Sequence, residues 1–463
     1  MTETIGATMF CCPPPRVFLA MACMLVIAGH AAAHEGHHRP DATQPVADFQ
    51  FDAADAAIPA TMLDNPSFYD GDVVSYAGQL WYACLEFVPG KGDRIRVARH
   101  DVSGEWSGNG VIDQLSEVAA PTLTVDGKGR LWLSYEARQA DSWDVYLVQL
   151  VDGKPATAPG RVSRGDGASI HHRTSATVDG LWIVWQADRH GQFDIVARRM
   201  IDGVLQDIHT VSDNPRGDWH PSIAVDRRGQ VHIVWDSFVD GTFDVYLRSY
   251  RRGAWGEKIA IATSPAFEAR TDIVIDSHDR AWIVWEEGGE NWGRPYRGID
   301  TTTIRDQHGP LHRFRSIRIA VVDADGTTHS LADPLPMPAL EQARRRTGRP
   351  PGVEQTGAFY ERTKLAVDRA GHVWLVYRHF YTPWLGVTHR SHVQQAWGVF
   401  ARCTTDGRWS PLYRLSIGQG DGLQRLEVAT HKDGIVVLWT TGRTDRKADD
   451  RPRGLATATL SAS

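Results

Sequence analysis

Hydrophobic and polar residues alternate in short runs along most of the chain, and these runs occur in pairs. Residues 221–235 (PSIAVDRRGQVHIVW) hold two such runs around a polar turn with Asp and Gly, and the second run ends in an aromatic residue. The same pattern recurs in residues 121–135, 174–185, 271–285 and 363–377. Alternation with period two on both sides of a tight turn is typical of a β-hairpin. The pattern therefore predicts a series of hairpins.

Several of these hairpins are followed by a third alternating run of one type. Residues 143–150, 193–200 and 243–250 begin with an aromatic residue and Asp, and short fourth runs lie near Trp255 and Trp409. Two weaker hairpins complete the set, in residues 72–87 and 425–439. A four-stranded unit that recurs at roughly fifty residues is a propeller blade. We therefore predict an all-β chain that forms a single β-propeller of about seven four-stranded blades.

The last unit provides three strands, the third in residues 455–460. The strand-like segment ADFQFD, residues 47–52, has no blade of its own. We predict that an N-terminal strand from this segment completes the last blade, because this closes the ring and removes a sheet edge; the alternative is an unstructured tail. The propeller then spans residues 61–463, with insertions at about 290–358 in blade 5 and 380–396 in blade 6.

The N-terminus has the pattern of an export signal. Arg16 precedes an apolar run in residues 17–28, and three alanines follow at 31–33. The apolar run is too short for a membrane span, and no later run is apolar enough for one. We interpret residues 1–33 as a cleavable signal peptide, which predicts a periplasmic or secreted protein, and residues 34–60 as a His-rich tail with the closing strand.

Composition narrows the function classes. The net charge of −6 argues against nucleic acid as a partner, because phosphate binding requires a basic face. The 17 tryptophans favour β structure.

Beyond the signal only Cys84 and Cys403 remain, so we expect buried free thiols and no disulfide framework. The histidines at 34, 37 and 38 could bind copper or zinc, but no rigid set of ligands lies near them. We expect no metal, no cofactor and a monomer.

Two blades carry a resemblance to a known family. The segments GDWHPSIAVDRRGQVHIVWDSF and FEARTDIVIDSHDRAWIVWEEGGENWG resemble the propeller region of large exported bacterial proteins with BNR/neuraminidase-like or TolB-like repeats. In those proteins the propeller precedes a C-terminal domain of unknown function. The resemblance covers about residues 60–450 and implies a propeller and export, with no catalytic residues to carry over. The full Asp-box of sialidases, with Ser before the Asp and Thr-Trp after the Gly, is absent.

Basic residues recur just before the innermost strand of successive units. They are Arg173, His220, Arg270, Arg362 and Arg425. If the strands are in register, these residues surround one mouth of the channel and attract an anion, because Arg binds carboxylate, phosphate or sulfate through two hydrogen bonds. The ends of the second strands supply mostly the opposite charge. These residues are Glu136, Gln186, Asp236 and Glu286, with Arg378 in the sixth unit. The alternative is that the two sets pair with each other and bind nothing.

A second cluster suggests catalysis. Its residues are Arg378, His379 and Tyr381, together with His171, His172 and His220. They could provide a base, an acid and an anion clamp, which β-elimination from a uronic acid requires; the alternative is a hydrogen-bonded surface network. A sialidase-like hydrolase would need a Tyr–Glu pair. Tyr360 and Glu361 are adjacent in a strand and point to opposite sides, so we rank hydrolysis below the lyase.

Further candidates lie in the long connections. Asn291 and Trp292 open the blade 5 insertion and, with Glu286 and Trp219, are expected to bind the ligand. Trp219, Trp292 and Trp384 could stack on sugar rings. We assign Trp182, Trp235, Trp282 and Trp374 to blade packing, and Asp126, Asp226 and Asp368 to tight turns rather than calcium sites. The favoured function is binding of an anionic ligand, expected to be a glycan; the alternative is a polysaccharide lyase.

Overall fold

The computed structural model describes only part of the chain. The described residues are 56–57, 61–63, 68–100, 106–112, 117–165, 167–189, 191–288, 315–331, 359–381, 396–405, 408–418, 425–441 and 454–462. All of them belong to the unit Phe49–Ser463. Their secondary structure consists of strands without a helix, so the all-β prediction is confirmed. No helix among these residues is long and apolar enough to cross a bilayer.

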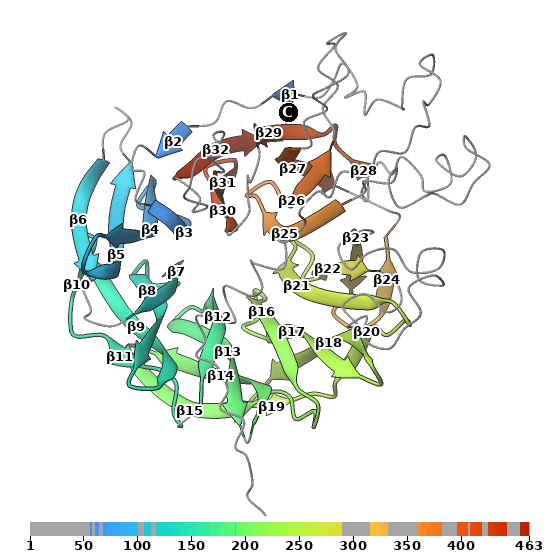
Figure 1. The fold of residues 1–463 in the computed structure, drawn as a ribbon. Coiled ribbons are helices and arrows are strands. Elements are labelled where there is room, and N and C mark those ends of the chain that lie inside the picture. The colour runs from blue at the N-terminus through green and yellow to red at the C-terminus, as the bar shows by residue number, and fades with distance from the viewer. Residues whose placement is uncertain are drawn as a thin grey trace, which may run out of the picture. The chain divides into compact units, whose positions relative to one another are not determined.

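The strands form seven antiparallel blades around a common axis, which confirms the predicted propeller (Figure 1). Blade 1 contains β3 (Phe68–Tyr76), β4 (Gln79–Val88), β5 (Gly92–His100) and β6 (Trp106–Ile112). Blade 2 contains β7 (Val118–Val125), β8 (Leu131–Gln139), β9 (Ser142–Val151), β10 (Lys154–Pro155) and β11 (Gly160–Arg161). Blade 3 contains β12 (Ser169–Ala176), β13 (Gly180–Arg189), β14 (Gln192–Ile201) and β15 (Val204–Thr210). Blade 4 contains β16 (Asp218–Val225), β17 (Val231–Val239), β18 (Thr242–Arg251), β19 (Ala254–Trp255) and β20 (Ile259–Ala262).

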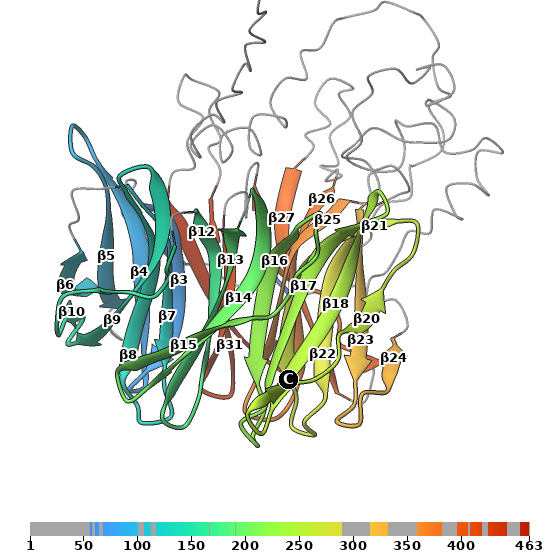
Figure 2. The ribbon, with the colours of Figure 1, turned by 90° about the horizontal axis from the view of Figure 1, so that it is seen from below.

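The remaining blades follow the same order. Blade 5 contains β21 (Phe267–Ile275), β22 (Ala281–Gly288), β23 (Arg315–Val322) and β24 (Thr328–Ser330). Blade 6 contains β25 (Phe359–Val367), β26 (Val373–Tyr381), β27 (Ala396–Thr405), β28 (Arg408–Trp409) and β29 (Tyr413–Gly418). Blade 7 contains β30 (Leu426–His431), β31 (Gly434–Thr440) and β32 (Leu455–Ser461). The first strand of each blade lies nearest the axis, and the strands run between two faces of the ring (Figures 1 and 2).

An N-terminal strand completes blade 7, as predicted, but it is β2 (Thr61–Leu63) that does so. β2 pairs antiparallel with β32, from Thr61 opposite Thr457 to Leu63 opposite Leu455. The shorter β1 (Ala56–Ala57) pairs in parallel with β29 of blade 6. The segment 47–52, from which we expected this strand, lies outside the described residues.

An aspartate organises the turn between the first two strands of several blades. Asp276 Oδ1 accepts the N–H groups of His278 and Arg280 at 2.8 and 3.0 Å, and its Oδ2 accepts the indole N–H of Trp282 at 2.9 Å. Asp126 and Asp368 make the corresponding bonds in blades 2 and 6. The prediction that these aspartates serve tight turns is therefore confirmed.

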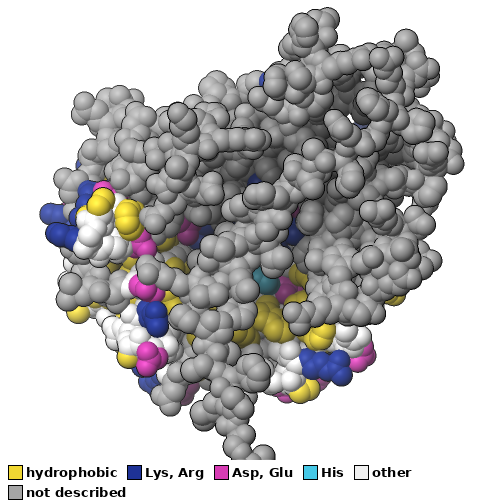
Figure 3. Space-filling view, viewed as in Figure 1, with side chains coloured by type: hydrophobic (Ala, Val, Ile, Leu, Met, Phe, Trp, Pro, Cys, Tyr) yellow, Lys and Arg dark blue, Asp and Glu magenta, His cyan; other side chains and the backbone are white. Residues whose placement is uncertain are grey.

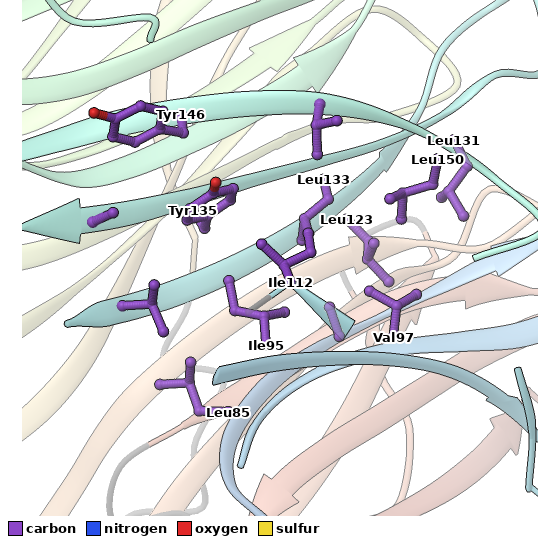
Figure 4. Packing of buried hydrophobic residues seen from close by; sticks show 14 of the residues in the cluster. Leu85, Ile95, Val97, Ile112, Leu123, Leu131, Leu133, Tyr135, Tyr146 and Leu150 are labelled. Carbon is purple, nitrogen blue, oxygen red and sulfur yellow. The ribbon is translucent and has the colours of Figure 1, made fainter. Parts of the chain in front are cut away.

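Hydrophobic clusters between neighbouring blades form the core. Figure 4 shows the cluster between blades 1 and 2, where Leu85 and Ile95 face Leu133 and Tyr135. The predicted packing tryptophans, Trp182, Trp235, Trp282 and Trp374, are all buried. Both cysteines are free and buried, Cys84 in β4 and Cys403 in β27. Burial of each large apolar side chain contributes about 1.5–3 kcal/mol, so the blade interfaces carry most of the stability.

Candidate functional site

The inner strands of five blades share an irregularity near their first residues. The pairing of β7, β12, β16, β21 and β25 with the next strand shifts register there. At each shift one residue that is not glycine has a left-handed φ between 47° and 60°. These residues are Ala120, His171, His220, Arg270 and Arg362. Such a conformation costs about 1–2 kcal/mol, so the surrounding structure must impose it.

We call these five residues, with Asp70 of β3 and Arg425 just before β30, the mouth ring. Each blade contributes one residue, at the end of its inner strand where the strand begins. Figure 3 shows this face of the molecule, where acidic and basic side chains and a histidine are visible near the middle. The predicted residues His171, His220, Arg270, Arg362 and Arg425 thus come together on one face of the ring.

The comparison of the sequence repeats predicted Arg173 as the blade 3 member of this ring. The strand register in blade 3 shows that this prediction was wrong. His171, rather than Arg173, corresponds to His220. The alignment matched Val178 with Val225 of β16, but Val178 lies in a shorter turn and is 82% exposed. Arg173 lies two residues further along its strand, level with Ser222, Asp272 and Lys364.

The acidic and amide residues predicted opposite the ring hold its backbone in place. Gln186 accepts the N–H of His220 at 3.2 Å, Asp236 that of Arg270 at 2.9 Å, and Glu286 that of Arg362 at 2.7 Å. Each acceptor belongs to the blade before its donor, so these bonds join neighbouring blades. Glu136 of blade 2 makes the equivalent bond to blade 3, because its carboxylate accepts a hydrogen bond from the backbone N–H of His172 at 3.1 Å.

Carboxylates also neutralise the arginines on the blade 5 and 6 side. Arg270 contacts Glu286 at 3.1 Å, and Arg378 contacts Glu361 at 2.6 Å. Arg315 pairs with both of these glutamates. Burial alone would raise the pKa of Glu361, but Arg378 and Arg315 hold it below its usual range. Sequence reasoning missed Arg315, because a long insertion separates it from its blade.

A second charged network lies beside Arg425. Its Nε is 2.8 Å from Glu427 and 3.6 Å from Asp70, and Glu427 also pairs with Lys364 at 2.8 Å. Although burial acts in the opposite direction, Lys364 and Arg425 lower the pKa of Glu427 to about 2. Burial and the negative charge of Glu427 raise the pKa of nearby Asp72 to about 6. The guanidinium of Arg425 is thus engaged by the nearby carboxylates of Glu427 and Asp70.

Two of the predicted catalytic histidines are buried in the interior, as is Arg378. His172 is fully buried, with Nδ1 3.0 Å from Glu136 and Nε2 3.0 Å from the Ser134 hydroxyl. His379 is buried against Phe400, with ring centroids 5.9 Å apart. Both positions suit packing between strands. The backbone of Tyr381 ends β26, and its side chain lies outside the described part, as do Asn291, Trp292 and Trp384.

His171 and His220 lie together. Their ring centroids are 5.3 Å apart, with one edge toward the other face. His220 Nδ1 lies 3.1 Å from both carboxylate oxygens of the fully buried Asp236, which orients its ring. His171 keeps an exposed edge, but desolvation by the surrounding strands and the adjacent His220 lower the pKa of His171 well below its usual range. A neutral imidazole therefore lies beside a carboxylate-bound one.

Arg173 differs from the arginines of blades 5 to 7. It is half-buried, and one of its Nη1–H groups donates to the carbonyl of His172 at 3.2 Å. No carboxylate of the described residues comes within 4.0 Å of its guanidinium. Its positive charge still contributes to the lowered pKa values of His171 and Glu427. The site therefore has a cation available on the same side as the two histidines.

Trp219 precedes His220 and lies against Phe243, with ring centroids 5.2 Å apart. Phe243 also contacts Phe238 at 5.2 Å and Phe267 at 4.9 Å. These four rings are half-buried at the ends of strands on the mouth-ring side of blades 4 and 5. The predicted aromatic residue thus belongs to a larger cluster beside the histidines.

The chain matches no protein-family model, and it has no match among curated proteins. Among solved structures it is similar to two of a PL25 polysaccharide lyase, an ulvan lyase, at 11% identity over 88% of this chain and 94% of that one. Their TM-scores are 0.50 for the structure bound to GlcA(1-4)Rha3S and 0.51 for the other. A sialidase from Trypanosoma rangeli matches with a TM-score of 0.40 and 10% identity, over 85% of this chain and 53% of that one. At such identities the likeness concerns the fold alone.

Proposed function

We propose that this chain is an exported propeller that binds an acidic glycan beside the mouth ring, on the blade 3 and 4 side. The observation that carries the proposal is the Arg173 guanidinium, which lies on the same side as His171 and His220 without a carboxylate partner among the described residues. Arg270 and Arg425 are engaged by the neighbouring carboxylates of Glu286 and Glu427. The anion site is thus smaller than the ring of arginines that the sequence suggested.

The chemistry of these three side chains suits a uronic acid. Arg173 can donate two parallel hydrogen bonds to a carboxylate. The neutral His171 can accept from a sugar hydroxyl, and the Nε2 of His220 is available because Asp236 occupies Nδ1. The ulvan lyase structure with a bound glucuronate-containing oligosaccharide shows that a propeller of this fold accommodates an acidic glycan. Export rests on the signal-like N-terminus alone.

Calorimetric titration with glucuronate oligosaccharides tests this proposal. The change Arg173→Gln should weaken binding about tenfold or more, because it removes a charge-assisted contact. Arg227→Gln is the matched control, since Arg227 is an exposed arginine in the β16–β17 turn on the other face and pairs with Asp279. Equal affinities of the wild type and Arg173→Gln would contradict the proposal.

A second candidate function is β-elimination, and the arrangement of Asp236, His220 and His171 favours it. An imidazole oriented by a buried carboxylate is a suitable general base for the C5 proton, and Arg173 would neutralise the adjacent uronate carboxylate. The C4–O bond breaks as the C4=C5 double bond forms, and the leaving oxygen takes a proton from solvent. The wild type should then produce an ultraviolet-absorbing unsaturated uronate, and His220→Ala should not. Hydrolysis has no such support, because Arg315 and Arg378 engage Glu361.

A further inference from the structure

The aromatic cluster beside the histidines is particular to one place in the ring. Trp219 pairs with Asp236, and the residues at this position in the neighbouring blades are Ala119, Ile170 and Ala269. Phe238 lies opposite Phe243, whereas Arg138 and Asp188 lie opposite Trp143 and Phe193, the residues of β9 and β14 that correspond to Phe243. Blade packing therefore does not require aromatic side chains at the positions of Trp219 and Phe238, whereas the position of Phe243 is aromatic in all three blades.

The cluster has the character of a binding platform. Trp219, Phe238, Phe243 and Phe267 are each half-buried, so part of each ring remains open. Figure 3 shows hydrophobic side chains next to a histidine over β16 and β17. The indole N–H of Trp219 has no acceptor among the described residues and is not enclosed. An apolar face with a free donor at its edge suits the face of a sugar ring, whose C–H groups stack on aromatic rings while its hydroxyls accept hydrogen bonds.

We propose that Trp219, with Phe238, Phe243 and Phe267, forms a stacking subsite for a second sugar residue. This inference rests on the proposed binding of an acidic glycan. The platform begins next to the site of His171, His220 and Arg173, because Trp219 precedes His220 in β16 where the register shift and the left-handed φ of His220 interrupt the regular alternation of side chains. A ligand that uses both runs outward from the mouth ring over blade 4. The ligand class is therefore an acidic oligosaccharide or polysaccharide rather than a single sugar acid.

The test compares ligands of different length on the intact protein. Titration of the wild type with glucuronate and with a glucuronate-containing tetrasaccharide should give about tenfold tighter binding of the longer ligand. Trp219→Ala should reduce the affinity for the tetrasaccharide to that for glucuronate and leave glucuronate binding unchanged. Trp219→Phe retains a ring and should keep most of the gain, which separates stacking from a loss of folding.

Trp143 supplies the matched control, because it is the second residue of β9 as Phe243 is of β18, and it lies opposite Arg138 instead of an aromatic residue. Trp143→Ala should leave both affinities unchanged. Equal wild-type affinities for the two ligands, or an equal loss for both in Trp219→Ala, would overturn the stacking subsite while binding through Arg173 stands. Failure of both ligands to bind the wild type would instead overturn the proposed function, and this inference with it.

Discussion

At the residue scale, the mouth ring depends on an unfavourable backbone conformation. Ala120 adopts a left-handed φ of 48°, and its counterparts His171 and Arg270 have φ values of 55° and 60°, but Ala120 has no functional side chain. Ala120→Gly should therefore raise the free energy of unfolding by about 0.5–1 kcal/mol, because glycine adopts this conformation without the cost that a Cβ atom adds. Chemical denaturation of the two proteins measures the difference.

Ala119→Gly provides the control, because Ala119 is adjacent in the same strand and does not have a left-handed φ. It should lower the stability through the greater freedom of glycine in the unfolded chain. If both glycine variants lose stability to the same extent, the left-handed conformation at Ala120 carries no strain.

The residue scale is also where sequence reasoning about the site was least complete. It found His171 and His220, but adjacent residues in a strand differ in environment, and it could not separate the half-exposed His171 from the buried His172. It named Glu286 among the acidic residues that could pair with the arginines, but it did not identify Asp70 and Glu427 as the partners of Arg425. Arg315, which shares both glutamates of its neighbours, carries no local signal at all.

At the element scale, the Asp-containing turns fix the hairpins. The carboxylate of Asp276 accepts two backbone N–H groups, the Arg280 guanidinium and the Trp282 indole. Asp276→Ala should lower the free energy of unfolding by about 2–4 kcal/mol at neutral pH, because it leaves several buried donors unsatisfied. Thermal or chemical denaturation measures the loss.

The pH dependence identifies the cause of that loss. Burial alone would raise the pKa of Asp276, but hydrogen bonds from Trp282 and Arg280 hold it below its usual range. Its stabilisation is therefore present above the ordinary carboxyl pKa and is lost as the pH falls through the lowered one. The difference between the wild type and Asp276→Ala should narrow in acid. Asp325→Ala, which removes an exposed turn aspartate, should change little; a similar loss in both variants would contradict the argument.

These turns explain why the hairpins could be predicted from the sequence. The Asp, the following Gly and the Trp six residues after the Asp are local and visible in the chain, as in residues 126–132. Blade 3 departs from this spacing with a shorter turn around Val178, so the sequence alignment misplaced Arg173. Local patterns thus predict the blades, whereas the ring of side chains also depends on where each turn ends.

At the scale of the whole molecule, the junction between blades 6 and 7 differs from the four junctions between blades 2 and 6. Blades 2 to 6 are joined by a side-chain acceptor on one blade and a backbone N–H of the next. In β26 the residue at the acceptor position is Arg378, whose guanidinium cannot accept a hydrogen bond. The backbone N–H of Arg425 instead donates to Thr440 Oγ1 of its own blade at 3.4 Å. The N-terminal strands cover both sides of this junction, because β1 pairs with β29 of blade 6 and β2 with β32 of blade 7. We infer that this segment replaces the missing bond.

Truncations of different length test the role of this segment. Removal of residues 1–66 deletes β1 and β2 and should lower the melting temperature by roughly 5 °C or more, because it opens the edge of β32 and frees the junction. Removal of residues 1–59 deletes β1 alone and should lower the melting temperature by a smaller amount. Removal of residues 1–52 keeps both strands and serves as the control, with a melting temperature close to that of the chain without residues 1–33. If the longest truncation melts with the control, the ring is held by its blade interfaces alone; if the loss already occurs on removal of 1–52, the strand predicted in residues 47–52 contributes to closure itself.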